Sequence, residues 1–242
     1  MQFNWLKIKL ILLLVLISGL FYSTISVNNL RDIKSSDIYM YSYDNLFISE
    51  DSIQNVISEL LVIKNSNKSN IHKNNLESEL NKNELINQSD VFVDVNGNMI
   101  VNIKQRKPIA RFLDNKNYLD VNGLIMPKSK DYSALVPIIV GFNQSTLQLK
   151  SIYKLSHFIY EDKFLRKNIT KIIVDSTGNF VLKLRKHKFK VSLGRLDKLE
   201  LKVNNFKAFY VKGMKDQILN KYSTINLQFD NQVVAIKKIG YE

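Results

Sequence analysis

The three histidines of this chain are the first candidates for chemistry, because an imidazole can act as an acid, a base or a metal ligand near neutral pH. His72, His157 and His187 are far apart in the sequence, and none belongs to a recognised zinc or catalytic spacing. We therefore interpret all three as solvated surface residues. The sequence contains no cysteine, which excludes disulfides, thiolate metal sites and a cysteine nucleophile.

The remaining catalytic motifs are missing as well. The sequence has no Gly-x-Ser-x-Gly element, no His-Glu-x-x-His element and no phosphate-binding glycine loop. Asp94, Asp114 and Asp120 fall beside predicted hairpin turns, where aspartate favours the turn geometry. We expect a protein that is not an enzyme, with no catalytic, metal-binding or cofactor-binding residues and no cofactor.

Basic residues outnumber acidic ones by 35 to 22, which gives a net charge of +13. This excess has two interpretations, which are binding to nucleic acid or anionic lipid and a general richness in lysine, asparagine and isoleucine. The lysines are spread along the chain, which favours the second. The densest basic run is Lys183–Lys190, "KLRKHKFK". On a strand its apolar residues can pack while its charges stay solvated, so a solvated face is favoured there over a nucleic-acid site.

The elements that must position any site begin with an apolar N-terminus. No charged residue occurs from Leu10 to Leu30, and Lys7 and Lys9 come just before this span. About 20 mostly apolar residues cross a bilayer as a helix. A cleaved signal peptide is the alternative, but it needs small residues at an A-x-A-like site, and we find none. We predict an uncleaved anchor with its short end in the cytoplasm.

The next region predicts a small α+β unit. "DIYMYSYDNLF" is extended, and "SEDSIQNVISELL" is a helix with Ile53, Val56, Ile57 and Leu60 on one face. "NNLESELNKNEL" predicts a second helix. Two alternating apolar runs follow, joined by Asn96-Gly97, a strong hairpin signal. The predicted order is strand, helix, helix, strand, strand.

The pattern changes at Pro108, in the stretch "VNIKQRKPIARF". Proline cannot donate a hydrogen bond to a strand ladder, so we expect it to end the preceding strand, with the basic Arg106 and Lys107 at the surface. Beyond it come several short strands and two helical stretches, 147–165 and 195–213. The last residues, "STINLQFDNQVVAIKK", predict two more strands. The second region is thus sheet-rich with two helices, and the fold class is α+β.

Several segments carry a resemblance to a known family. "QRKPIARF" at the junction, "YLDVNGLIMP" and "VPIIVG" after it, and "SLGR", "FKAFY" and "INLQFDNQVV" further on occur in an order that resembles the bacterial cell-division protein family FtsQ, called DivIB in some bacteria. The resemblance covers essentially all 242 residues. Two features depart from the family: the long polar loop "KNSNKSNIHKNN", and the lack of a proline-tryptophan-like signal before the second strand of the first unit.

The resemblance implies three parts: residues 1–30 as a cytoplasmic end and transmembrane helix, 31–107 as a POTRA domain of order β-α-α-β-β, and 108–242 as an FtsQ-type β domain. It implies a single-pass scaffold of the inner (cytoplasmic) membrane at the division septum, with most of the chain outside the cytoplasm. FtsB, FtsL and other divisome membrane proteins are the implied partners, and control of septal wall synthesis is the implied role. Neither nucleic acid nor a small-molecule substrate is expected.

The resemblance also implies a partner-binding strand near the C-terminus, where FtsB adds a strand to an open sheet edge. The expected partner-binding residues are Phe229, Asn231, Gln232, Val233, Val234, Ala235 and Ile236. Phe229 has a second interpretation, as a residue of the core. Arg106, Lys107 and Pro108 are the expected interdomain junction.

Three other functions compete with this interpretation. An envelope assembly or secretion factor is the main alternative, since POTRA domains also occur there; a single such unit and an N-terminal helical anchor speak against it. A membrane-anchored hydrolase lacks motifs, and a DNA-binding membrane protein is motivated by the net charge alone.

Overall fold

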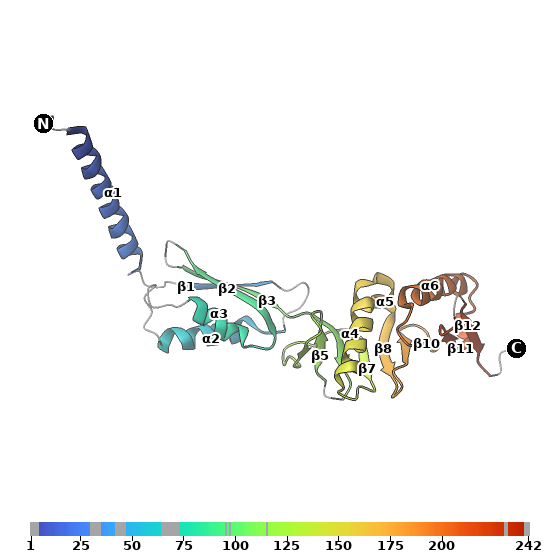
Figure 1. Cartoon of the computed structure of the whole chain (residues 1–242). Helices are drawn as coiled ribbons and strands as arrows, with labels where there is room; N and C mark the ends of the chain where they lie inside the picture. Colours follow the sequence, from blue (N-terminus) through green and yellow to red (C-terminus); the bar gives the residue numbers. More distant parts are fainter. Residues whose placement is uncertain are drawn as a thin grey trace. The chain divides into compact units, whose positions relative to one another are not determined.

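The computed structural model describes residues 5–29, 35–41, 47–63, 73–94, 96, 98–114, 116–229 and 232–239 (Figure 1). The chain divides into two compact units. The first unit comprises Met1–Gln105 and Ser129–Tyr132, and the second comprises Arg106–Lys128 and Ser133–Glu242. Each unit has its own hydrophobic core.

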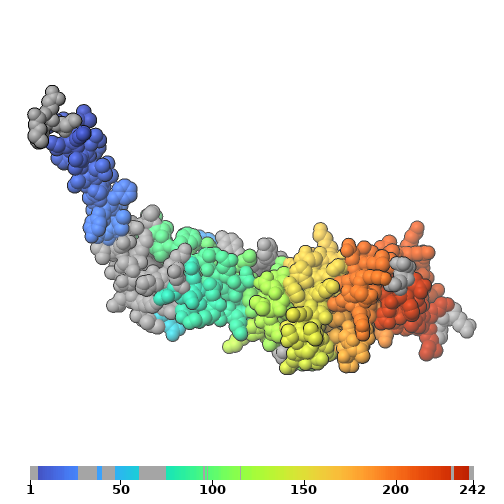
Figure 2. All heavy atoms as spheres, viewed as in Figure 1, coloured from blue at the N-terminus to red at the C-terminus, as the bar shows by residue number. Residues whose placement is uncertain are grey.

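The N-terminal helix α1 runs over Trp5–Asn29. Its segment Trp5–Ser26 has a mean hydropathy of 2.2 and none of it is buried, and Figure 2 shows this helix with its side chains uncovered. At 1.5 Å per residue the segment is about 33 Å long, close to the hydrocarbon thickness of a bilayer, about 30 Å. The helix therefore fits a single-pass membrane protein.

The first unit continues with β1 (Ser35–Tyr41), α2 (Glu50–Ile63), α3 (Lys73–Asn81), β2 (Ile86–Val93) and β3 (Asn98–Gln105). The three strands form a sheet of order β1-β3-β2. The central strand β3 pairs parallel with β1 and antiparallel with β2. The order of elements is the strand, helix, helix, strand, strand that the residue pattern predicts.

One face of α2 packs on this sheet, as its spacing predicts. Ile53 and Ile57 are each 1% exposed, and Val56 is half-buried against the same core. Ser49 stands before the first turn, where its hydroxyl accepts a hydrogen bond from the Ser52 N–H (3.4 Å). The side chain of Leu60 lies outside the described residues. Burial of this face supplies most of the stability that such a short helix needs.

A short segment from later in the chain completes the first unit. The Ser129 hydroxyl donates to the Phe47 carbonyl, and the rings of Phe47 and Tyr132 meet edge to face at 5.2 Å. The Phe47 N–H donates to the Gln105 side chain at 2.7 Å. These contacts bury Phe47 before α2 begins, and they explain why residues 129–132 belong to the first unit.

The second unit is built on a nine-stranded sheet of order β12-β11-β10-β9-β8-β7-β4-β5-β6. Its strands are β4 (Pro108–Phe112), β5 (Tyr118–Asp120), β6 (Ile125–Met126), β7 (Ile138–Val140), β8 (Ile169–Val174), β9 (Phe180–Leu184), β10 (Lys190–Gly194), β11 (Tyr222–Asn226) and β12 (Val234–Lys237). The helices are α4 (Thr146–Glu161), α5 (Lys163–Asn168), α6 (Leu199–Lys215) and the 3₁₀ turn η2 (Leu219–Lys221).

A single row of apolar side chains crosses this sheet and forms the sheet side of the hydrophobic core. The row consists of successive register partners, namely Phe112, Ile139, Ile172, Leu182, Val191, Ile225 and Ala235. All but Ala235 are buried, and they join α4 and α6 side chains such as Ile152, Leu155 and Phe206 in one cluster. Because side chains alternate along a strand, their immediate neighbours face the other side of the sheet.

The helix count of the second unit differs from the prediction. The stretch 147–165 is not one helix, because Asp162 ends α4 and begins α5. Its backbone is extended, and its carboxylate accepts the Leu165 N–H at 2.9 Å as an N-cap. Burial raises the pKa of Asp162, but hydrogen bonds from Lys207 and Leu165 lower it below its usual value. A capping aspartate therefore makes three α-helices where two were expected.

Candidate functional site

Strand β12 forms one end of the nine-stranded sheet. It pairs antiparallel with β11, from Val234 opposite Asn226 to Lys237 opposite Tyr222. Within the described part of the chain no strand pairs with its other side. An open side of this kind presents a row of backbone donors and acceptors, which is a template for another strand.

The side chains of β12 alternate between the two faces of the sheet. Val233 and Ala235 pack against the core. Val234 is half-buried, and Ile236 is 50% exposed. The expected partner-binding residues of this strand thus present aliphatic groups on both faces of an open edge.

The strand is shorter than the sequence predicts. Gln232 and Val233 precede it, and Asn231 lies outside the described residues. The reason lies in β11, whose last pairing residue is Asn226. After Asn226 the chain turns, because the Asn226 side-chain oxygen accepts the Gln228 N–H at 3.0 Å, so the ladder with β12 does not extend further.

Phe229 is 50% exposed and does not belong to the buried core. It lines a shallow depression at the start of α6, together with Lys198, Leu201, Lys202, Asn205, Leu227 and Gln232. A half-exposed aromatic side chain next to an open strand has the properties of an interface anchor.

An ion pair between Lys202 and Asp197 lies beside this depression. The ammonium of Lys202 is almost buried and donates to the Arg195 carbonyl (2.9 Å) and to the Asp197 carboxylate (3.0 Å). The hydrogen bond from Lys202 is the main cause that lowers the pKa of Asp197. These contacts hold the Lys202 ammonium in place beside the depression.

The two histidines that the structure describes lie among aromatic side chains. His187 is half-buried, stacks on Phe189 and shares a hydrogen bond of 3.1 Å with the Tyr210 hydroxyl. His157 is also half-buried and contacts the ring of Tyr153. Both are thus less solvated than we expected, because aromatic neighbours cover part of each ring. His72 lies outside the described residues. In the part of the chain that is described, no three His, Cys, Asp or Glu side chains gather as a metal site.

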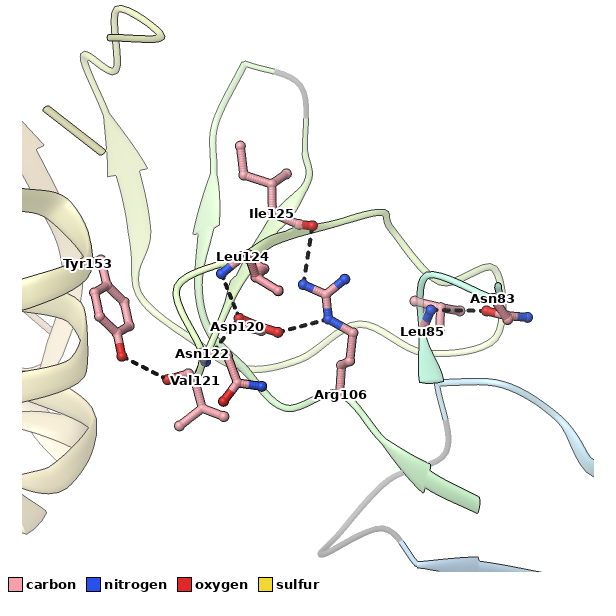
Figure 3. A network of polar contacts seen from close by, with 9 residues as sticks. All are labelled: Asn83, Leu85, Arg106, Asp120, Val121, Asn122, Leu124, Ile125 and Tyr153. Atoms are coloured by element: carbon pink, nitrogen blue, oxygen red, sulfur yellow. Dashed lines mark hydrogen bonds and ion pairs between the residues drawn. The ribbon is translucent and has the colours of Figure 1, made fainter. Parts of the chain in front are cut away.

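The junction residues are also less exposed than expected. The Arg106 side chain is 11% exposed, and its Nε donates to Asp120 at 2.8 Å while Nη2 donates to the Ile125 carbonyl at 3.2 Å (Figure 3). Lys107 is half-buried, with its ammonium 5.1 Å from the centre of the Tyr160 ring. The basic pair is therefore only partly exposed, and each cation has a partner within the second unit.

The partner of Arg106 is a buried carboxylate that sequence reasoning assigned only to a turn. Asp120 is 0% exposed, and its Oδ1 accepts the N–H groups of Asn122 (3.0 Å) and Leu124 (2.8 Å). The Tyr153 hydroxyl donates to the Val121 carbonyl at 3.0 Å and joins this turn to α4 (Figure 3). The positions of Arg106 and Asp120 in the sequence follow no pattern that would predict their contact.

Pro108 opens a strand instead of closing one. Strand β3 ends at Gln105, and β4 begins at Pro108, which lies opposite Asp120 in the register. The first residue of a strand is a position where the missing N–H of proline is tolerated. The two compact units divide between Gln105 and Arg106, so Arg106, Lys107 and Pro108 all lie in the second unit.

A comparison with curated proteins found no match to this chain. A comparison with family models did find one: the model described as FtsQ/DivIB, C-terminal related, matches residues 107–236. The match spans more than half of the 242 residues and runs from the start of β4 into β12. It includes Phe229 and most of the open strand. The chain belongs to the FtsQ/DivIB family of cell-division proteins.

Proposed function

We propose that this protein is a single-pass membrane scaffold of the division machinery that binds FtsB and FtsL and helps control septal wall synthesis. The observation that carries the proposal is the open side of β12 within the region that matches the family. No catalytic machinery is needed for such a role, which works by holding other proteins together.

The proposed binding mode is strand addition to β12, in which an extended segment of FtsB pairs with the open edge. Backbone hydrogen bonds give the affinity in this mode, and pockets for alternate side chains give the specificity. Val234 and Ile236 would flank the added strand on one face, and Phe229 and Gln232 would meet the segment that leads into it. Ala235 and Val233 keep the edge attached to the core.

The domain assignments follow from the same proposal. Residues 31–105 are a POTRA domain, and the FtsQ-type β domain begins at Arg106, two residues before the boundary expected from the resemblance, because the two compact units divide there. Residues 1–30 are the cytoplasmic end and membrane helix. The POTRA assignment is supported by the order of elements and by the sheet order β1-β3-β2. An envelope assembly or secretion factor would share a POTRA domain, but the family of residues 107–236 favours division.

The membrane topology gives a direct test of the anchor. We expect the helix α1 to stay uncleaved, with its N-terminus in the cytoplasm, because Lys7 and Lys9 precede the span. A reporter that is active only outside the cytoplasm should be active when fused after Glu242, and the same reporter fused before Met1 should be silent. Recovery of a mature protein that begins near Ser26 would contradict the anchor.

The partner proposal is tested by titrating the full chain, held in nanodiscs, with the extracytoplasmic part of FtsB. Val234→Pro removes an N–H from the edge strand and distorts its backbone, and Phe229→Ala truncates the expected anchor. We expect the first change to abolish strand addition and the second to cost about 2 kcal/mol or more of binding free energy.

Two matched controls make the same kinds of substitution, to proline and to alanine, at positions in α4 away from β12. Thr146→Pro places proline at the first position of α4, where it is tolerated, and Leu147→Ala truncates a side chain that is 80% exposed. Both should bind FtsB like the parent. If the Val234 and Phe229 variants melt like the parent and bind equally well, FtsB docks on another surface.

A further inference from the structure

Three lysines lie side by side on neighbouring strands of the second unit. Lys171 of β8 is the register partner of Lys183 of β9, which is in turn the register partner of Lys190 of β10. All three side chains are exposed. We call them the lysine row. The run Lys183–Lys190 is visible in the sequence, but the position of Lys171 opposite Lys183 follows from the strand register.

The lysine row lies on the face of the sheet opposite the helices. The residues next to it on the same three strands, Ile172, Leu182 and Val191, are buried in the core with the helices. Two residues along each strand, Ile173 and Val181 pair with one another and are half-buried. The face thus carries a line of three cations beside two aliphatic side chains, which are followed on β10 by Ser192.

This arrangement places like charges directly opposite one another, which destabilises a sheet. No ion pair relieves it among the described residues. Asp175 is the only acidic residue in the sequence from Lys163 to Arg195. Its carboxylate accepts hydrogen bonds from Thr177 and Asn179 in the β8–β9 turn, which lower its pKa to about 2. Among the described residues the positive charge of this face is therefore offset by no ion pair and is exposed to solvent.

We propose that the lysine row is a docking surface for an acidic, amphipathic helical segment of another protein. Neighbouring strands are about 4.8 Å apart, close to the spacing of about 5–6 Å between side chains one turn apart on a helix. Carboxylates on one side of such a helix can face the lysines, while its aliphatic side chains cover Ile173 and Val181. An anionic membrane is less well matched, because these two aliphatic groups are only half-exposed and no aromatic side chain stands in either line.

This surface is separate from the proposed FtsB edge. The register continues from Lys190 through Thr224 of β11 to Ile236 of β12, so β11 lies between the lysine row and the edge strand. The inference therefore does not depend on strand addition at β12. A scaffold with both surfaces could hold two partner segments on one sheet.

The test uses the full chain in nanodiscs of neutral lipid and a fluorescent amphipathic peptide with a glutamate face. The triple variant Lys171→Gln, Lys183→Gln, Lys190→Gln should bind the peptide about tenfold more weakly, since three exposed ion pairs are lost. The matched control removes the same charge from exposed helix positions, as Lys150→Gln, Lys212→Gln, Lys215→Gln, and should bind like the parent. Val234→Pro should also bind like the parent, which separates this surface from the FtsB site.

Reversing the charge of one lysine adds the melting temperature as a second measurement. Lys183→Glu creates an opposite-charge pair with both neighbours, so it should raise the melting temperature while it weakens peptide binding. Equal losses in the two triple variants would show a mere effect of net charge and overturn the proposal. Unchanged peptide binding by the lysine-row triple variant would overturn it too. It would also fail if the row mediated co-sedimentation with vesicles rich in phosphatidylglycerol and left the peptide unbound.

Discussion

Arg106→Leu is expected to lower the free energy of unfolding of the second unit by roughly 3–5 kcal/mol, because it leaves a buried carboxylate without its cation. The side chains of Arg106 and Asp120 are 11% and 0% exposed, and the Nε–Oδ2 distance is 2.8 Å. After the change Oδ1 keeps the N–H groups of Asn122 and Leu124. Oδ2 loses its partner inside the protein, where water cannot replace it.

A double variant shows whether the loss comes from the orphaned charge. Adding Asp120→Asn to Arg106→Leu removes the buried charge and should restore part of the stability, whereas Asp120→Asn alone leaves Arg106 facing a neutral group. Denaturant titration followed by circular dichroism measures all three variants, and hydrogen exchange at the amides of β4 and β5 locates the effect. A loss below about 1 kcal/mol, which is the range of exposed ion pairs, would mean that Asp120 is solvated in solution.

The pair also shows where sequence reasoning stops. The strands on both sides of it were predictable, because alternation and turn residues are local signals. The Arg106–Asp120 contact is not local, since it joins a connecting segment to a turn across the β4–β5 pairing. From the sequence alone, a basic residue near a proline is interpreted as a surface residue, because the sequence does not indicate which carboxylate will lie beside it in the fold.

The candidate site was predictable to a similar extent. The open last strand and Phe229 were expected from the resemblance, and the family match covers that region. The start of the strand was not, because it depends on the end of β11 at Asn226, whose side chain accepts the Gln228 N–H. The lysine row was missed for the same reason: Lys171 lies opposite Lys183 only through the β8–β9 register, which shifts between Ile169 and Lys171.

Gly141→Ala is the second large effect that we expect, with a loss of about 2–5 kcal/mol from left-handed strain and overpacking together. Gly141 follows β7 and has φ +86. A Cβ atom there would lie 2.1 Å from the carbonyl oxygen of Val174, at the end of β8. The obstacle is backbone, so no change of rotamer can relieve it, and the parallel β7–β8 pair must move apart.

Gly178→Ala is the matched control, because it shares the conformation and lacks the clash. Its φ is +81, and nothing lies within 4 Å of the position of a Cβ. It should lose only the conformational part, about 1–2 kcal/mol. The difference between the two variants in denaturant titration then measures the backbone contact alone, and equal losses would show that Val174 moves aside freely. Strands β7 and β8 join β4–β6 to β9–β12 in one sheet. Hydrogen exchange at the amides of β8 and β9 should therefore be faster in the Gly141 variant than in the parent. Faster exchange that also reaches β12 would show that the segment at Gly141 is coupled to the proposed partner-binding edge.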